Sequence, residues 1–137
     1  MQRVVVDANV FVSYLTGRHA KQYDAAQALL REAEDGNLVA VLPQFVIFEV
    51  TYVLHSLYDL SGERLASTVR ALVSFPGVQI VDHCPWNRVL EMWPDPFPGL
   101  ADPSIVAVAM TNRHHAVATF DRKLANKLEA FGLTPYF

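Results

Sequence analysis

Short apolar runs alternate with longer helical segments along the chain, and this alternation leaves few folds open. Four runs have the composition of buried strands, at residues 3–6, 37–43, 78–81 and 116–119. Helical patterns lie at residues 9–15, 20–36, 44–60, 65–73, 85–93, 102–113 and 121–132, and an edge strand is expected within 133–137. Continuous apolar strands joined by helices are typical of parallel sheets. The sequence therefore predicts an α/β fold, a central parallel sheet with helices on both faces.

One of these helical segments has an unusual composition. Residues 44–60 are apolar on nearly every side, which predicts a helix buried all round. Glu49 interrupts this segment, and the segment contains no Lys or Arg that could neutralise it. A buried carboxylate without a partner is costly, so Glu49 requires either a distant basic residue or a bound cation.

Length and composition limit the class of protein. The 137 residues fit one domain over 1–137, and no apolar run reaches the roughly 18 residues that span a bilayer. The start of the chain enters a strand directly, so we expect no signal peptide. Cys84 is the single cysteine, which excludes an intrachain disulfide. These features predict a cytoplasmic protein without membrane association.

The charge balance does not favour nucleic-acid binding by charge alone. Fourteen acidic residues against eleven Lys and Arg give a net charge of −3, whereas such proteins are usually basic. Cations held by a group of acidic residues would change this balance locally and would attract phosphate.

Four acidic residues occupy positions that suggest one site. Asp7 directly follows the first strand, and Asp121 follows the run at 116–119 by one residue. The carboxyl ends of parallel strands are where such sheets bind ligands. Asp102 opens a helix after a Pro-rich loop, and helix starts that follow strands gather at the same end. With Glu49, these side chains would form a cluster that repels itself unless divalent cations are bound.

Each residue also has a purely structural interpretation. Asp7, Asp102 and Asp121 can each cap the helix that follows, and Glu49 can pair with a distant basic residue. The four acidic residues together are stronger evidence for a common site than any one of them alone. Mg²⁺ and Mn²⁺ prefer carboxylate oxygen and water ligands, and such ions promote attack on phosphodiesters.

The ordered motifs resemble the PIN domain family. They are "VVVDANVFV", Glu49 within its apolar helix, "LADPSIVAVA" and "TFDRKL". More narrowly, the chain is similar to VapC-type toxins of toxin–antitoxin pairs, along essentially its whole length. The resemblance implies a five-stranded parallel sheet and an endoribonuclease that depends on Mg²⁺ or Mn²⁺. It also implies an RNA substrate, a cognate VapB-type antitoxin and a homodimer.

The resemblance assigns roles to individual residues. Asp7, Glu49, Asp102 and Asp121 match the acidic quartet that holds the metal for attack by an activated water. Asn9 and Thr119 match supporting polar positions. In two places the chain departs from the family: Ala8 replaces a frequent Thr or Ser, and Pro103 replaces a common Ala. Neither departure removes a ligand, so we expect activity to survive.

The basic, aromatic and histidine side chains each have a functional and a structural interpretation. Basic side chains that can contact RNA phosphates, or simply form solvated surface, are Arg18, Lys21, Arg122 and Lys123. Aromatic rings that can stack on bases, anchor the Pro-rich loop or contact a partner are Trp86, Trp93 and Phe97. The five histidines lack zinc-site spacing, and His114–His115 is expected in an exposed turn.

Three functions fit the pattern. The first is a toxin ribonuclease, the second is a PIN-domain ribonuclease in housekeeping RNA processing, and the third is an inert PIN-fold RNA-binding module. The presence of all four acids argues against the third. An aspartyl-phosphate phosphatase would need an acid two residues after Asp7, where the chain has Asn9.

Overall fold

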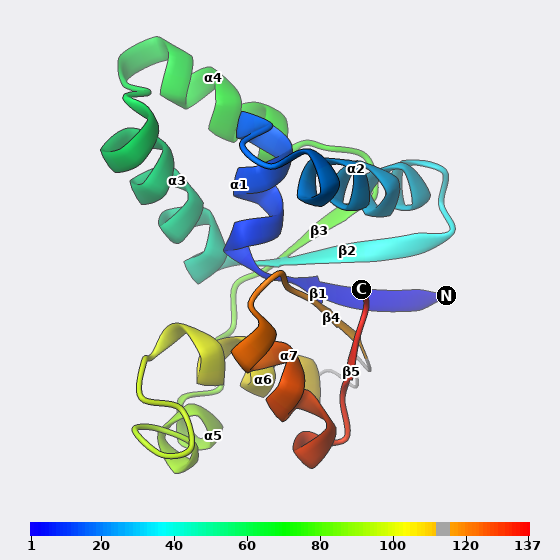
Figure 1. The fold of residues 1–137 in the computed structure, drawn as a ribbon, viewed down its shortest axis with the longest axis vertical. Coiled ribbons are helices and arrows are strands. Elements are labelled where there is room, and N and C mark those ends of the chain that lie inside the picture. The colour runs from blue at the N-terminus through cyan, green and yellow to red at the C-terminus, as the bar shows by residue number, and fades with distance from the viewer. Residues whose placement is uncertain (112–115) are drawn as a thin grey trace.

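The computed structural model describes residues 1–111 and 116–137 and contains a five-stranded sheet (Figure 1). The strands are β1 (Gln2–Val6), β2 (Leu38–Pro43), β3 (Val78–Val81), β4 (Ala116–Ala118) and β5 (Thr134–Pro135). Their order is β3-β2-β1-β4-β5, and every neighbouring pair is parallel. The predicted parallel sheet is confirmed, including its fifth, edge strand.

Helices cover both faces of this sheet, as predicted (Figure 1). On one face lie α1 (Ala8–Thr16), α2 (Ala20–Glu34), α3 (Gln44–Tyr58) and α4 (Gly62–Val73). On the other lie α5 (Trp86–Glu91), α6 (Ala101–Thr111), α7 (Arg122–Lys127) and the 3₁₀ turn η1 (Leu128–Phe131). None of the helices in the described ranges is long and apolar enough to cross a bilayer.

The strand order reverses its direction at β1. The chain first builds outward through β2 and β3, then returns to the opposite side of β1 for β4 and β5. Crevices at such reversals, beyond the carboxyl ends of the strands, are the usual ligand sites of open parallel sheets. The register pairs Val6 with Ala118, so the residues after β1 and β4 emerge side by side.

The core forms from the strands, from one side of most covering helices, and from α6, in which residues 103–109 are all buried. Val4, Val5 and Val6 are fully buried, and so is Phe11 of α1. Phe97, in the Pro-rich loop, is also buried and stacks on Phe131. Of the three candidate aromatic residues, Phe97 is thus an anchor of the loop.

The prediction of a helix buried on all sides at residues 44–60 is wrong. Only Val46, Val50 and Leu54 of α3 are buried, because a helix on the outer face of a sheet turns one stripe inward. The opposite side exposes large apolar side chains: Phe48, Tyr52 and Leu57 have 68%, 71% and 72% of their surface accessible. The apolar composition of this helix therefore does not indicate that it is buried on all sides.

Two further boundaries differ from the sequence prediction. The segment expected as one helix over 121–132 divides into α7 and η1, and Gly132 ends it in the left-handed conformation. The helix expected at 102–113 begins one residue earlier, at Ala101, so Asp102 lies inside its first turn rather than capping it. Residues 112 and 113 of that segment, and the turn expected at His114–His115, lie outside the described residues.

Candidate active site

Asp7 and Asp121 lie next to each other because β1 and β4 are neighbours. The backbone N–H of Asp7 donates a hydrogen bond of 2.9 Å to the carbonyl of Ala118, the last residue of β4. This bond extends the ladder one residue beyond the end of β1. The carboxyl side chains that follow therefore enter the crevice where the strand order reverses.

The carboxylate of Asp7 is buried, with 7% of the residue exposed, and its hydrogen bonds come from three directions. One oxygen, Oδ1, accepts from the backbone N–H of Ala8 at 2.8 Å, which caps α1. The other, Oδ2, accepts from Thr119 Oγ1 at 2.7 Å and from Asn9 Nδ2 at 3.2 Å. The side chain is therefore held in one orientation.

Thr119 and Asn9 tie the two strand ends together. Asn9 Nδ2 also donates to Thr119 Oγ1 at 3.3 Å, and Asn9 Oδ1 accepts from the backbone N–H of Phe120 at 3.0 Å. Thr119 Oγ1 in turn accepts from the backbone N–H of Asp121 at 3.1 Å. The two predicted supporting residues thus link α1 to the loop that carries Asp121.

Asp121 caps α7 with one of its oxygens. Its Oδ1 accepts from the backbone N–H groups of Lys123 at 2.9 Å and Leu124 at 3.4 Å. No donor among the described residues forms a hydrogen bond with Oδ2 of Asp121. That oxygen is therefore free to accept a further ligand.

Glu49 and Asp102 reach the same crevice from opposite faces of the sheet. Glu49 belongs to α3 and Asp102 to the first turn of α6. Together with Asp7 and Asp121, they line one cavity of about 180 Å³, whose wall also includes Asn9 and Arg18. The structure thus brings all four predicted carboxylates to one place, although they are up to 114 residues apart in the chain.

The electrostatics of this cavity oppose ionisation. Burial raises the pKa of Asp7 above its ordinary value, and the nearby Asp121 adds to the rise, while hydrogen bonds from Thr119, Ala8 and Asn9 oppose it. Contrary to the sequence prediction, Glu49 lies on the exposed side of α3 and not in the core. Partial burial of its carboxyl in the crevice nevertheless raises its pKa, and Asp7 and Asp102 contribute further.

Asp102 behaves in the same way. Burial raises the pKa of its carboxyl, and the charges of Asp7 and Asp121 add to that rise, whereas Lys127 lowers it. Lys127 is itself held at a distance by other contacts, since its Nζ donates to the Pro96 carbonyl at 2.9 Å and lies 5.0 Å from the centre of the Phe97 ring. From the sequence, Lys127 is expected only on an ordinary exposed helix face with Lys123; the packing of α7 brings its charge close enough to affect Asp102.

The donor set fits a hard divalent cation. Within residues 1–111 and 116–137, no basic side chain forms an ion pair with any of the four carboxylates. Negative charges gathered without a basic partner need a cation, and carboxylate oxygens are the ligands that Mg²⁺ and Mn²⁺ prefer. In the same ranges, no group of three or more His, Cys, Asp or Glu side chains already stands in ligating positions. Metal binding would therefore draw the four side chains closer together.

The candidate RNA-contacting residues divide between two depressions. Arg18 lines the acidic cavity, and its guanidinium donates to Ser13 Oγ at 3.2 Å. Lys21 and Arg122 line a neighbouring cavity of about 430 Å³, which shares Asp121 with the acidic one. Lys123 is exposed and lines neither.

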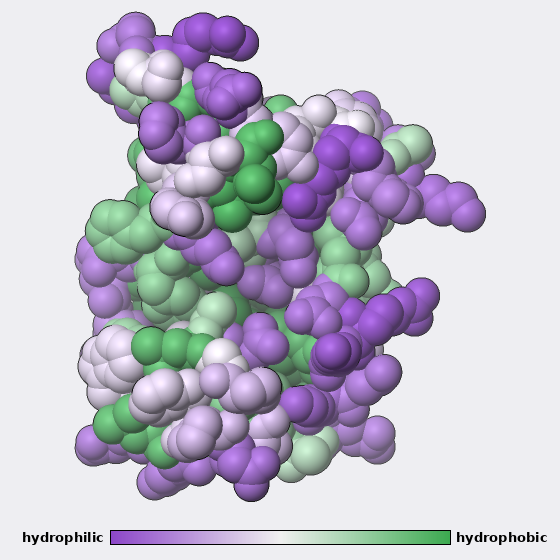
Figure 2. Space-filling view, turned by 60° about the vertical axis from the view of Figure 1, so that its left-hand side comes forward, coloured by the Kyte–Doolittle hydropathy of each residue, from purple (hydrophilic) through white to green (hydrophobic). Residues whose placement is uncertain are grey.

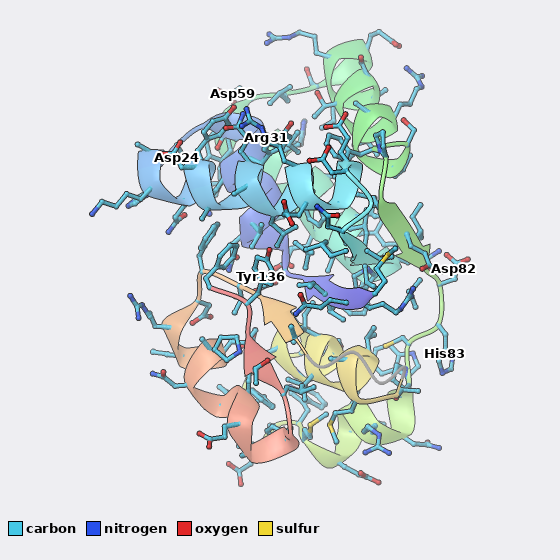
Figure 3. The ribbon with its side chains drawn as sticks, turned by 90° about the vertical axis from the view of Figure 1, so that its right-hand side faces the viewer. Asp24, Arg31, Asp59, Asp82, His83 and Tyr136 are labelled. Carbon is cyan, nitrogen blue, oxygen red and sulfur yellow. The ribbon has the colours of Figure 1, made fainter. Side chains whose placement is uncertain are left out.

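A third cavity, which the sequence did not suggest, adjoins the acidic one on the side of Glu49. It measures about 520 Å³ and lies between α3 and the segment that leads from β3 to α5, where Asp82 and His83 are labelled in Figure 3. Trp86, one of the three aromatic candidates, lines this cavity with 51% of its surface exposed. Trp93 instead donates its indole N–H to the Pro98 carbonyl at 3.2 Å.

Comparison with known proteins agrees with this architecture. The family model of the PIN domain matches residues 4–128, so the chain belongs to the PIN domain family. No curated protein sequence matches the chain.

Among solved structures, the fold is similar to that of VapC20 from Mycobacterium tuberculosis, a toxin described as cleaving the sarcin–ricin loop. The TM-score is 0.67 at 16% sequence identity, and the match covers 90% of this chain and 93% of that one. At this identity the likeness shows a shared fold.

Proposed function

We propose that this protein is a divalent-metal-dependent endoribonuclease, and that it is the toxin of a VapBC-type toxin–antitoxin pair. The observation that carries the proposal is the cluster of Asp7, Glu49, Asp102 and Asp121 around one small cavity without a basic partner among the described residues. An acidic cluster of this kind suits phosphodiester hydrolysis, because bound cations convert it into a site attractive to RNA phosphate.

In this proposal the chain's own residues have separable roles. Asp7, Glu49, Asp102 and Asp121 would hold Mg²⁺ or Mn²⁺, directly or through water. The bound ion would supply an activated water and stabilise negative charge on the phosphate. Thr119 and Asn9 would keep Asp7 ionised and oriented, since both donate to its Oδ2. Arg18, Lys21 and Arg122 would contact phosphates of the RNA on either side of the cleaved bond.

Partners and setting follow from the same proposal. VapC20 is described as a toxin that cleaves the sarcin–ricin loop, and by analogy we propose single-stranded or loop RNA as the substrate here. A cognate VapB-type antitoxin, a homodimer, a cytoplasmic location and a single functional domain over 1–137 remain predictions. Exposed Leu57 and Leu90 offer apolar surface of the kind that protein partners cover.

The test is cleavage of a broad RNA panel by the wild type and by Asp7→Asn, with Mg²⁺, Mn²⁺ or a chelator. Asp24→Asn is the matched control, because it neutralises an exposed acid of α2 away from the cavity (Figure 3). We expect cleavage by the wild type and the control only when metal is present, and none by Asp7→Asn. Cleavage that persists in chelator would refute the metal mechanism.

A second experiment separates the toxin from the two alternatives. Brief expression of the wild type and of Asp7→Asn, followed by mapping of RNA ends, shows which RNA is cut. Growth arrest that a neighbouring antitoxin gene relieves would support the toxin, and cleavage without arrest would favour housekeeping processing. RNA binding without cleavage by either form would favour the inert module.

A further inference from the structure

Three depressions follow one another across the carboxyl ends of the strands. The cavity lined by Lys21 and Arg122 shares Asp121 with the acidic cavity. The acidic cavity shares Glu49 and Ala101 with the large cavity beside α3. A strand whose phosphate lay at the four carboxylates would therefore extend into a basic depression on one side and into the large cavity on the other.

The large cavity has the wrong chemistry for a phosphate. Glu49 and Asp82 line it, and no Lys or Arg of the described ranges 1–111 and 116–137 does. Its walls include the rings of Phe45, Phe48 and Trp86, with Gln44 and Ser104 as additional polar groups. Figure 2 faces this side of the molecule and shows apolar surface both above and below the hollow. Aromatic walls with a few hydrogen-bonding groups suit a flat, neutral, polar-edged ring.

The two most exposed rings that line this cavity have no structural role that explains their exposure. Trp86 and Phe48 have 51% and 68% of their surface accessible. Among the described residues, neither ring stacks on another ring or forms a side-chain hydrogen bond. Two solvent-exposed rings therefore line one cavity next to Glu49, a carboxylate of the site.

We infer that this cavity is a nucleobase subsite, which receives one unpaired base of the RNA next to the phosphate that is cut. Trp86 and Phe48 would stack on the base, while Gln44 and Asp82 would offer a donor and an acceptor to its edge. The inference rests on the proposed function, because the acidic cavity defines where the phosphate lies. The volume of about 520 Å³ is ample for one base and falls within the range of about 300–1,000 Å³ usual for small-ligand sites.

The competing occupant is a side chain of a protein partner that docks on α3. Tyr52 separates the two cases, because it is 71% exposed on the same helix, one turn after Phe48, but does not line the cavity. A partner that covers the exposed side of α3 would contact both residues, whereas a base in the cavity would contact Phe48 alone. Tyr52→Ala is therefore the matched control.

The first experiment measures cleavage kinetics with full-length protein, Mg²⁺ and a single-stranded RNA that the wild type cuts. Stacking on one base is worth about a factor of 5 to 150, so Trp86→Ala should raise KM roughly tenfold with kcat little changed. An abasic substitution next to the cut should have the same effect, and the two changes together should be no worse than either alone. Trp86→Phe should restore most of the loss, and Tyr52→Ala should behave as the wild type.

Two outcomes would overturn the inference. One is an equal effect of Trp86→Ala and Tyr52→Ala, which would favour a protein-binding face. The other is full additivity between Trp86→Ala and every abasic substitution, which would show that the ring contacts no base.

A binding measurement keeps the inference separate from the nuclease proposal. The chain has two tryptophans, so Trp93→Phe leaves Trp86 as the only tryptophan, whose fluorescence can be excited without that of the tyrosines. With Mg²⁺ present and Asp7→Asn added to prevent cleavage, single-stranded RNA of about 12 nucleotides, within the usual range of site sizes, should quench Trp86 fluorescence, and the same RNA without bases should not. If the wild type cuts no RNA, the proposed function fails while this quenching still decides the subsite. Equal quenching by both RNAs would refute the subsite.

Discussion

Thr119 is the residue whose removal tests the geometry of the acidic site most directly. Its hydroxyl donates to the buried Asp7 carboxylate at 2.7 Å and accepts from the backbone N–H of Asp121 at 3.1 Å. Thr119→Val removes the hydroxyl with almost no change in shape. A hydrogen bond to a charged group contributes about 1.5–3 kcal/mol, and the N–H of Asp121 also loses its partner.

From these contacts we expect Thr119→Val to lower the free energy of unfolding by about 2–3 kcal/mol. For a domain of this size each kcal/mol corresponds to roughly 3–4 °C, so the Tm should fall by about 6–12 °C. Thr119→Ser keeps the hydroxyl and should lose less than about 1 kcal/mol. Thr68→Val removes an exposed hydroxyl of α4 and should stay within about 0.5 kcal/mol of the wild type.

Urea unfolding and thermal unfolding measure these differences. The same variants should also differ in metal dependence, because the Thr119 hydroxyl lowers the pKa of Asp7. Without it, Asp7 holds its proton to higher pH, so the pH at which Mg²⁺ stabilises the protein should move upward. Equal stability of Thr119→Val and the wild type would refute the assigned network.

Two further predictions concern pH and the backbone. Burial and mutual repulsion raise the pKa values of Asp7, Glu49 and Asp102 above their ordinary 3.8, 4.5 and 3.8. The folded state therefore binds these protons more tightly than the unfolded state, and in chelator the Tm should rise as the pH is lowered from neutral toward those ordinary pKa values; a Tm that falls instead would contradict the clustering. Separately, Gly77→Ala should cost at least about 2 kcal/mol in urea unfolding, because Gly77 has φ +83° and a Cβ there would lie 2.1 Å from the Ala33 carbonyl oxygen. Gly36→Ala, at φ +80° with open space, should cost about 1 kcal/mol, and equal losses would contradict the predicted clash.

The alternation of apolar strands and helices was sufficient to predict the parallel sheet and its two helical layers. The reason is physical, since a strand buried on both faces must be apolar throughout and parallel neighbours need a crossover. The same pattern did not predict that β1 and β4 are adjacent in the sheet. It follows from the reversal of strand order, which brings Asp7 to within one hydrogen-bonding step of Ala118.

The apolar composition of α3 led to a wrong prediction, namely that the helix is buried on every side. A helix on the outside of a sheet buries only one stripe, so the remaining apolar residues must be exposed or covered by something else. Local sequence does not distinguish Val50, which is buried, from Phe48 and Tyr52, which are not. The cavity beside α3 escaped prediction for the same reason, because its walls come from three segments that only the fold assembles.

The structural and functional interpretations of the aspartates turn out not to compete. Asp121 caps α7 through Oδ1 alone, and Asp7 caps α1 through its own Oδ1. In each case the cap holds one carboxylate oxygen at a strand end, which fixes the position of the other oxygen. A helix cap is thus compatible with the proposed ligand role of the same side chain. Replacement of Asp121 by Asn should keep much of the cap and lose metal affinity, whereas Asp121→Ala should lose both, by about 1 kcal/mol for the cap. Unfolding with and without Mg²⁺ distinguishes these cases, and an Asn variant that retained the full Mg²⁺ stabilisation would show that Asp121 serves the helix alone.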